Sequence, residues 1–320
     1  MTHRILLLGG SGFVGSHLAA RLVCDGHSVT VLSRQPFRHA ALRVLPTLKL
    51  VAADVHDEVA LAAACAQHDV VINLVGILNE AGRNGLGFRR AHTELARRVV
   101  DACRRSGVKR LLHMSALNAD AAKGASYYLR SKGEAEGIVL TQAGPELKVT
   151  VFQPSVIFGV DDDLTNRFVK LLGLAPIVFP LACPDAALAP VWVEDVVEVM
   201  ARAIDDRRSF GQRYQLCGPQ AYTLEELLRF IRDQRGRRTL IWRLPAWLGK
   251  LQAALLEFLP GKPFSLDNWR SLQVPSRCTS NGFAAFGVAP RALAAVAPAW
   301  LAGASARGRY DALRAAVGRN

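Results

Sequence analysis

The sequence of 320 residues predicts an α/β fold, with a doubly wound parallel sheet followed by a smaller C-terminal α/β lobe. Short apolar runs alternate with helical patterns along residues 1–160, and a glycine-rich turn follows the first of these runs. Beyond residue 160 the alternation loosens. Half of the residues are hydrophobic and 21% are charged, which is ordinary for a globular chain and argues against disorder.

The strands of the predicted sheet are apolar runs that helical patterns separate. Strands connected in this way form right-handed βαβ units, so we expect a parallel sheet that is covered on both faces. The expected strands are Arg4–Leu8, Ser28–Leu32, Leu48–Ala52, Val70–Val75, Arg110–His113 and Lys148–Gln153. The expected helices between them include Ser16–Cys24, Phe88–Ser106 and Ser126–Thr141.

The second half of the sequence predicts a smaller lobe. We expect residues 1–160 to form one domain, whose sheet is completed by segments near 191–217, and residues 161–320 to form a substrate lobe with a helical tail. Proline-rich turns separate the helical patterns Leu164–Leu172, Glu194–Ile204 and Leu224–Arg232. The most membrane-like stretch, Leu171–Val193, contains four prolines, so we expect buried strand and loop there rather than a membrane-spanning helix.

The turn after the first strand has the spacing of a dinucleotide-binding fingerprint. Gly9 permits the tight turn, Gly12 lets a pyrophosphate approach the bare backbone, and Gly15 lets the helix pack on the strand. The start of the helix offers unpaired N–H groups and a positive dipole to the phosphates. The predicted phosphate contacts are Gly9, Ser11, Gly12, Phe13, Val14 and Gly15.

The end of the second strand predicts which nucleotide is preferred. NAD binders usually place an acidic residue there to hold the ribose hydroxyls, whereas this chain has Ser33 and Arg34. A hydroxyl and a guanidinium suit a 2′-phosphate, because arginine donates paired charge-assisted hydrogen bonds to phosphate. We therefore expect NADP(H), with NAD(H) as the alternative.

Charge and cysteine content give weaker indications. The net charge is +13, but the one arginine cluster, at positions 89, 90, 97, 98, 104 and 105, is interleaved with Glu94 and Asp101. This pattern favours a solvated helix face with ion pairs over a nucleic-acid surface. The six cysteines lie far apart and are expected to be reduced thiols of a cytoplasmic protein. Histidines and cysteines show no metal-ligand spacing, so no metal site is expected.

Several motifs, in order, resemble those of the extended short-chain dehydrogenase/reductase family, whose nucleotide domain has the Rossmann fold. Residues 54–57 (Asp-Val-His-Asp) resemble its adenine-side motif, and residues 69–76 resemble its fourth-strand motif. Residues 128–132 match Y-x-x-x-K, and residues 154–159 resemble the loop around the nicotinamide. The resemblance implies further cofactor contacts at Asp54, Val55, Leu74, Val75, Gly76, Tyr128, Lys132, Pro154, Ser155 and Val156.

Within that family the chain is similar to the Rossmann-fold accessory subunits of respiratory complex I and their bacterial relatives. The residues that carry this likeness lie at 113–117, 128–136 and 258–263. In those proteins tight NADPH binding can outlast catalysis. The likeness therefore implies a contact with a respiratory complex as one alternative.

Tyr128 and Lys132 lie four residues apart on one helix face and are the candidate catalytic pair, with Ser115 polarising a carbonyl. Ala116 and Leu117 follow Ser115, where family members often have a second hydroxyl residue. The sequence thus predicts an NADP(H)-dependent oxidoreductase acting on an unknown carbonyl or hydroxyl substrate. A non-catalytic cofactor-holding accessory protein of a respiratory or quinone-linked membrane complex is the first alternative, and a nucleotide-sugar epimerase is the second.

The segment 242–259 carries an apolar stripe that includes Trp242, Trp247 and Leu255, with basic residues alongside. We expect a core or lobe-capping helix, with docking on a membrane or a partner as the alternative. The arginines on the predicted helix 88–106 would be buried in the dimer that is common in the family, so we expect a monomer. Nothing at the start of the sequence resembles an export signal, which predicts a cytoplasmic protein, with attachment to the inner face of a membrane as the alternative.

Overall fold

The computed structural model describes residues 2–302. The chain divides into two compact units. Within these residues, the first consists of residues 2–155, Val193–Cys217 and Cys278–Ala289, and the second consists of Val156–Trp192, Gly218–Arg277 and residues 290–302.

The first unit is built on a seven-stranded sheet in the order β11-β6-β5-β4-β1-β2-β3, in which every neighbouring pair is parallel. The predicted doubly wound parallel sheet is therefore confirmed. Apolar side chains of the central strands are fully buried, since helices cover both faces. The strands are β1 (Arg4–Leu8), β2 (Ser28–Ser33), β3 (Leu48–Ala52), β4 (Val70–Asn73), β5 (Arg110–Met114), β6 (Lys148–Pro154) and β11 (Gln212–Leu216).

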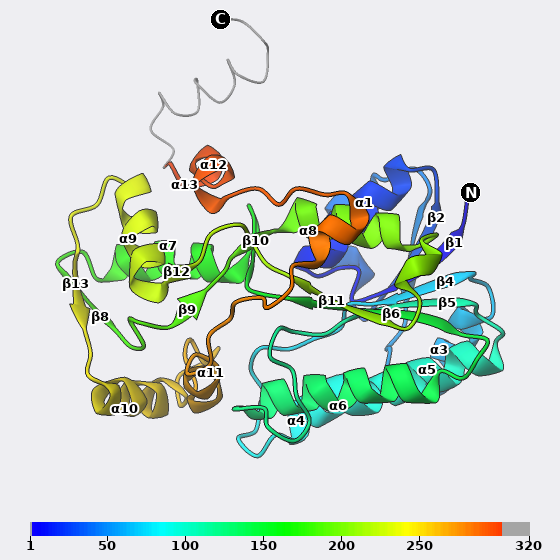
Figure 1. The fold of residues 1–320 in the computed structure, drawn as a ribbon, viewed down its shortest axis with the longest axis horizontal. Helices are drawn as coiled ribbons and strands as arrows, with labels where there is room; N and C mark the ends of the chain where they lie inside the picture. Colours follow the sequence, from blue (N-terminus) through cyan, green and yellow to red (C-terminus); the bar gives the residue numbers. More distant parts are fainter. Residues whose placement is uncertain (1, 303–320) are drawn as a thin grey trace, which may run out of the picture. The chain divides into compact units, whose positions relative to one another are not determined.

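Helices of the first unit form a layer on each side of this sheet (Figure 1). One layer contains α3 (Glu58–Cys65), α5 (Leu95–Arg105) and α6 (Tyr127–Gln142), and the other contains α1 (Phe13–Cys24) and α8 (Val193–Ala203). The segment before α5 is not a regular α-helix, because α4 (Leu86–Phe88) leads into a π-helical turn, η2 (Arg89–Glu94). Shorter elements are η1 (Pro36–Arg38), α2 (Ala40–Arg43), η3 (Arg207–Ser209) and η4 (Gly282–Phe286).

The second unit combines helices with three two-stranded ribbons around its own apolar core, which includes Phe158, Leu172 and Leu227. The ribbons are β7 (Ile157–Phe158) with β10 (Val191–Trp192), β9 (Ala187–Leu188) with β12 (Tyr222–Thr223), and β8 (Val178–Leu181) with β13 (Leu240–Arg243). The helices are α7 (Asp163–Leu174), α9 (Leu224–Gln234), α10 (Ala246–Leu256), α11 (Leu266–Ser271), α12 (Leu293–Val296) and α13 (Pro298–Leu301).

Two expectations about charged residues and cysteines are wrong in part. Cys217 and Cys278 form a disulfide, so these two are not reduced thiols. In the arginine-rich segment, Arg98 forms an ion pair with Glu58 of α3. Among the described residues, its arginines form no ion pair with the acidic residues of their own helix. The spacing along one helix could not reveal a partner on the neighbouring helix.

The apolar segments of the second unit are also less buried than expected. Leu174 and Ile177, within the stretch expected to be buried, are exposed. The large side chains of the tail stripe, Trp247 and Leu255 among them, face solvent as well, so its assignment to the core is wrong for them. Over residues 2–302, none of the helices has both the length and the hydropathy to cross a bilayer.

Candidate functional site

The candidate site lies along the edge of the sheet at which the parallel strands end. The strand order reverses beside β1, since β2 and β3 lie on one side of it and β4, β5 and β6 on the other. Such a switch point is where open α/β sheets bind ligands. Nearly all of the residues predicted for the site follow these strand ends, so the topology brings them to one edge.

The glycine turn at the end of β1 has the geometry that a phosphate site needs. Gly9 has a φ of +78°, which a residue with a side chain rarely adopts, and its carbonyl accepts the Gly12 amide at 3.0 Å. Gly12 is the N-cap of α1, and the Ser16 amide donates to its carbonyl at 2.9 Å. In the described part of the chain no side chain caps this helix start, so its first amides are available to phosphate oxygens.

Close packing explains the other glycines. A Cβ atom at Gly15 would lie 2.4 Å from the Gly9 carbonyl oxygen and 2.5 Å from the Gly10 Cα. At Gly15, therefore, the helix packs against the turn and not against the body of the strand. A Cβ atom at Gly9 would lie 3.0 Å from the Val75 amide nitrogen, so the turns after β1 and β4 approach each other closely at the switch point. At Gly12 the same atom would meet only the Gly9 oxygen, at 3.3 Å, so space for a ligand remains there.

The ends of β2 and β3 carry the residues expected at the adenosine end. Ser33 is buried and its hydroxyl accepts the Gln35 amide, whereas Arg34 is exposed. Beyond β3, the Asp54 carboxylate accepts the His56 amide at 3.0 Å, which fixes the turn that also contains Val55.

Three arginines from separate segments of the chain act on the charge of His56. Burial lowers the pKa of this histidine, and the charges of Arg90, Arg98 and Arg34 lower it further against the opposing effect of Asp54. Arg98 is already engaged, since it donates to the His56 carbonyl and pairs with Glu58. Sequence reasoning found Arg34 but missed Arg90, whose helical segment lies far from β2 in sequence. We call His56 with Arg34, Arg90 and Arg98 the cationic corner.

Lys132 of α6 is buried at the ends of β4 and β5. Its ammonium donates to the carbonyl oxygens of Met114 at 3.1 Å and Val75 at 3.4 Å. A Cβ atom at Gly76 would lie 3.0 Å from this ammonium, so the glycine lets the ammonium come close to the backbone there. Burial lowers the pKa of Lys132 to about 8, so the side chain is still charged at neutral pH.

Tyr128 lies one turn before Lys132 on α6. Its ring contacts His92 and Phe88 edge-on, with centroids 5.6 and 6.0 Å apart. Burial raises the pKa of Tyr128 to about 12. Burial is the cause that governs the pKa of this phenol, and Lys132, one turn away, does not offset it.

His92 connects the loop after β4 to the helix that carries the pair. Its Nε2 accepts the Ile77 amide at 3.1 Å, so its Nδ1 bears the proton and donates to the Ser131 hydroxyl at 2.8 Å. Ser131 in turn donates to the Tyr128 carbonyl. Burial lowers the pKa of His92 to about 2, and the neighbouring Lys132 lowers it too, so the ring is neutral. No sequence motif contains His92, and the one signal for it is a histidine on the buried face of a helical pattern.

Two buried polar atoms lie on or just after β5. The Ser115 hydroxyl and the Nε2 of His113 have no hydrogen-bond partner among residues 2–302. The Nδ1 of His113 lies 3.3 Å from the Asn73 amide nitrogen. An unpaired buried hydroxyl costs free energy unless a ligand satisfies it, so Ser115 is suited to a contact with a bound group.

The residues after β6 are held by the sheet. The Pro154 carbonyl accepts the Leu117 amide at 2.9 Å, and the Ser155 amide donates to Leu216 of β11 at 2.9 Å. Val156 belongs to the second unit. The structure therefore assembles the predicted site residues of the first unit at one edge and assigns Val156 to the other unit.

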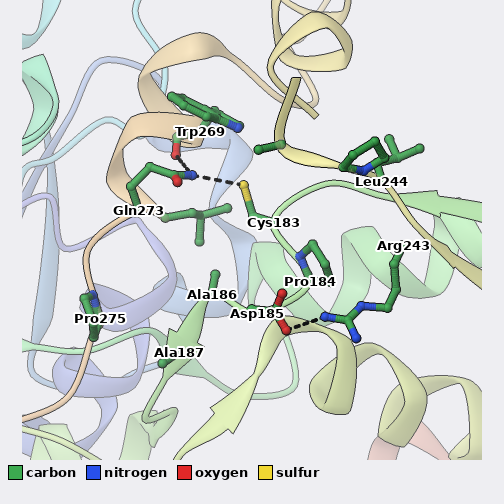
Figure 2. Close-up of a pocket in the computed structure, with 13 residues that line it drawn as sticks. Cys183, Pro184, Asp185, Ala186, Ala187, Arg243, Leu244, Trp269, Gln273 and Pro275 are labelled. Atoms are coloured by element: carbon green, nitrogen blue, oxygen red, sulfur yellow. Dashed lines mark hydrogen bonds and ion pairs between the residues drawn. The ribbon is translucent and has the colours of Figure 1, made fainter. Parts of the chain in front are cut away.

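The second unit has a cavity of its own, of about 550 Å³ (Figure 2). The Arg243 guanidinium pairs with Asp185 at 2.5 Å at one side of it, and the Gln273 amide donates to the Cys183 thiol at 3.3 Å at the other. Burial raises the pKa of this thiol. The lining of the cavity is mixed, with polar and apolar side chains.

Comparison with known proteins decides the family. A family model described as NAD(P)H-binding matches residues 9–171, which include the glycine turn, the strand ends through β6 and the Tyr128–Lys132 pair. The chain belongs to the NAD(P)H-binding family.

Individual proteins that are similar to this chain confirm the family resemblance that the sequence predicted. The chain is 31% identical over 276 residues to subunit 9 of the NADH dehydrogenase [ubiquinone] 1 alpha subcomplex of Arabidopsis thaliana, covering 82% of this chain but only 65% of that protein. It is 29% identical to a ceramide reductase of Caulobacter vibrioides, covering 75% and 73% of the two chains. Among solved structures, a UDP-glucose 4-epimerase of Thermotoga maritima superposes with a TM-score of 0.72 at 16% identity, over 98% and 99% of the chains. That likeness shows the fold alone.

Proposed function

We propose that this protein binds NADPH and reduces a carbonyl group of a small-molecule substrate, with Tyr128 as the proton donor. The observation that carries the proposal is the Tyr128–Lys132 pair, one helical turn apart, whose buried ammonium lies at the strand ends beside the glycine turn. The amides of residues 12–15 would hold the pyrophosphate, and Lys132 would hold the nicotinamide ribose. The nucleotide, when bound, supplies a hydride.

The preference for NADPH over NADH is supported by the cationic corner at the adenosine end. Arg34 is exposed and free to move toward a 2′-phosphate, and Arg90 acts on the same histidine from another element. No acidic residue stands at the end of β2 to hold a free ribose hydroxyl. Two guanidinium groups at one place favour the more negatively charged nucleotide.

The proton chemistry supports reduction rather than oxidation. With a pKa of about 12, the Tyr128 phenol is protonated at neutral pH. It can therefore give its proton to a carbonyl oxygen as the carbonyl carbon accepts the hydride, and it regains a proton from water. The Ser115 hydroxyl, which lacks a partner among residues 2–302, is a donor available to the same oxygen. The relative named as a ceramide reductase supports this class of reaction.

Replacing Tyr128 by phenylalanine tests the proposal. In a screen of carbonyl compounds that follows NADPH oxidation, Tyr128→Phe should lose about 100-fold or more in turnover, the typical contribution of a general acid. Its NADPH affinity should stay within about twofold, because the lost hydroxyl acts on the transition state. The matched control is Tyr127→Phe, which removes the neighbouring phenol and should retain turnover.

A non-catalytic accessory role is the second candidate, and the relatives named as subunits of NADH dehydrogenase [ubiquinone] favour it. In that case NADPH would stay bound through gel filtration, while no carbonyl, sugar nucleotide or quinone would be turned over. This result would refute the reductase proposal. The epimerase alternative rests on structures of low sequence identity, which carry no information about the substrate.

A further inference from the structure

One ribbon of the second unit has an apolar outer face. Strand β13 pairs with β8 so that Leu240 stands opposite Val178. The inner residues Ile241 and Phe179 are buried in the core of the unit, whereas Leu240, Trp242 and Val178 are exposed. A two-stranded ribbon normally turns polar side chains to water, so this face is suited to an apolar or interfacial environment.

Helix α10, which follows β13 in the chain, also turns large apolar side chains to the outside. Trp247, Leu251 and Leu255 are spaced four residues apart, lie on one face and are 68%, 48% and 62% exposed. The opposite face consists of small residues, Gly249 and Ala253, which are buried. A Cβ atom at Gly249 would lie 3.2 Å from the Cβ of Ala182, so the small residues let the helix pack closely. The large apolar side chains are left outside.

Along the sequence, the charges between Gln234 and Leu256 have one sign, although Arg243 is paired with Asp185 and Glu225 of other segments. Between Gln234 and Leu256 there is no aspartate or glutamate. The same stretch contains five cations, Arg235, Arg237, Arg238, Arg243 and Lys250. Arg237 and Arg238 are exposed immediately before β13. Exposed tryptophans and leucines flanked by cations are the combination that binds the headgroup region of an anionic bilayer.

We propose that Val178, Leu240, Trp242, Trp247, Leu251 and Leu255, called here the interfacial surface, bind the protein to a membrane that contains anionic phospholipids. Charge complementarity favours this partner over a second copy of the chain. Two copies paired through this surface would bring their arginines together, whereas lipid phosphates neutralise them. The proposal concerns the second unit and is independent of whether the first unit turns over a substrate.

Vesicle sedimentation tests the proposal with the full chain. The wild type should bind vesicles of phosphatidylcholine and phosphatidylglycerol, bind vesicles of phosphatidylcholine alone much more weakly, and lose affinity with added salt. The double variant Trp247→Glu/Leu255→Glu should lose about tenfold or more in affinity. The control is Val59→Glu, which places one such charge at an exposed apolar position of α3 in the first unit. It should bind like the wild type.

A second variant tests the proposal even if the first one does not fold. Arg237→Gln/Arg238→Gln leaves the apolar residues intact and should weaken binding by about fivefold for each cation removed. Both variants should keep the NADPH affinity of the wild type. The proposal is overturned if the wild type fails to sediment with phosphatidylglycerol vesicles at low salt, or if both variants sediment as the wild type does. It is also overturned if the protein is dimeric without lipid and Trp247→Glu/Leu255→Glu makes it monomeric, because the surface then joins two copies.

Discussion

The packing of Gly15 against the glycine turn predicts that Gly15→Ala lowers the stability of the protein, whereas Gly137→Ala raises it. In Gly15→Ala the new Cβ would lie 2.4 Å from one backbone atom and 2.5 Å from another, and neither can rotate away. Carbon contacts normally lie near 3.5 Å, so α1 and the turn must separate by about 1 Å. Overpacking of this kind costs about 3 kcal/mol. In Gly137→Ala, inside α6, the new atom meets nothing within 4 Å. That variant should gain about 0.5–1 kcal/mol from helix propensity.

Thermal unfolding without nucleotide and an NADPH titration by fluorescence measure both effects. Gly15→Ala should melt about 6 °C or more below the wild type and bind NADPH at least tenfold more weakly, since the amides that hold the pyrophosphate move with the turn. Gly137→Ala should melt at or slightly above the wild-type temperature and bind NADPH normally. Equal melting temperatures for the two variants would refute the reasoning. So would an unchanged NADPH affinity in Gly15→Ala.

Two further predictions concern stability. The pKa values of His92 and His113 are lowered from 6.5 to about 2 and about 3, so the unfolded state binds the extra protons as the pH falls below 6.5. The free energy of unfolding should be highest above pH 6.5 and should fall by about 1.4 kcal/mol per pH unit for each histidine down to about pH 4. Urea unfolding across this pH range should show a shallower decline for His92→Gln than for the wild type. A wild-type free energy that does not change with pH would contradict the assignment. The disulfide between Cys217 and Cys278 closes a loop with a sequence separation of 61. A reductant should therefore lower the free energy of unfolding of the wild type by about 4 kcal/mol and leave that of Cys217→Ser unchanged. If the reductant does not change the free energy of unfolding of the wild type, the two thiols are free.

Strand positions in the first unit could be predicted closely because each is a short apolar run between helical patterns. β1 and β3 have the predicted bounds, and the ends of β2 and β5 differ by one residue. The glycine spacing likewise located the turn at the end of β1. Such features depend on neighbours in sequence, which the pattern of residues records directly.

Features that depend on distant partners could not be predicted. The π-helical turn at Arg89–Glu94 interrupts what the periodicity presents as one helix. Its buried His92 acquires its partners only when β4 and α6 come together. The Cys217–Cys278 disulfide joins residues that no local spacing relates.

The orientation of α10 shows a different limit of the sequence. Its apolar stripe indicated a helix with one apolar face, but periodicity does not say which face is covered. Gly249 and Ala253 decide this, because only small residues allow the close approach to Ala182. The larger residues Trp247 and Leu255 are therefore displaced outward.

The central claim, an NADPH site whose preference comes from the cationic corner, is tested most directly by titrating NADPH and NADH against wild type and Arg34→Ala. The wild type should bind NADPH about tenfold or more tightly than NADH, the difference that one charge-assisted contact to phosphate makes. Arg34→Ala should lose most of that difference through weaker NADPH binding alone, while Arg105→Ala, an exposed arginine at the end of α5, should behave as the wild type. Equal affinities of the wild type for the two nucleotides would contradict the account.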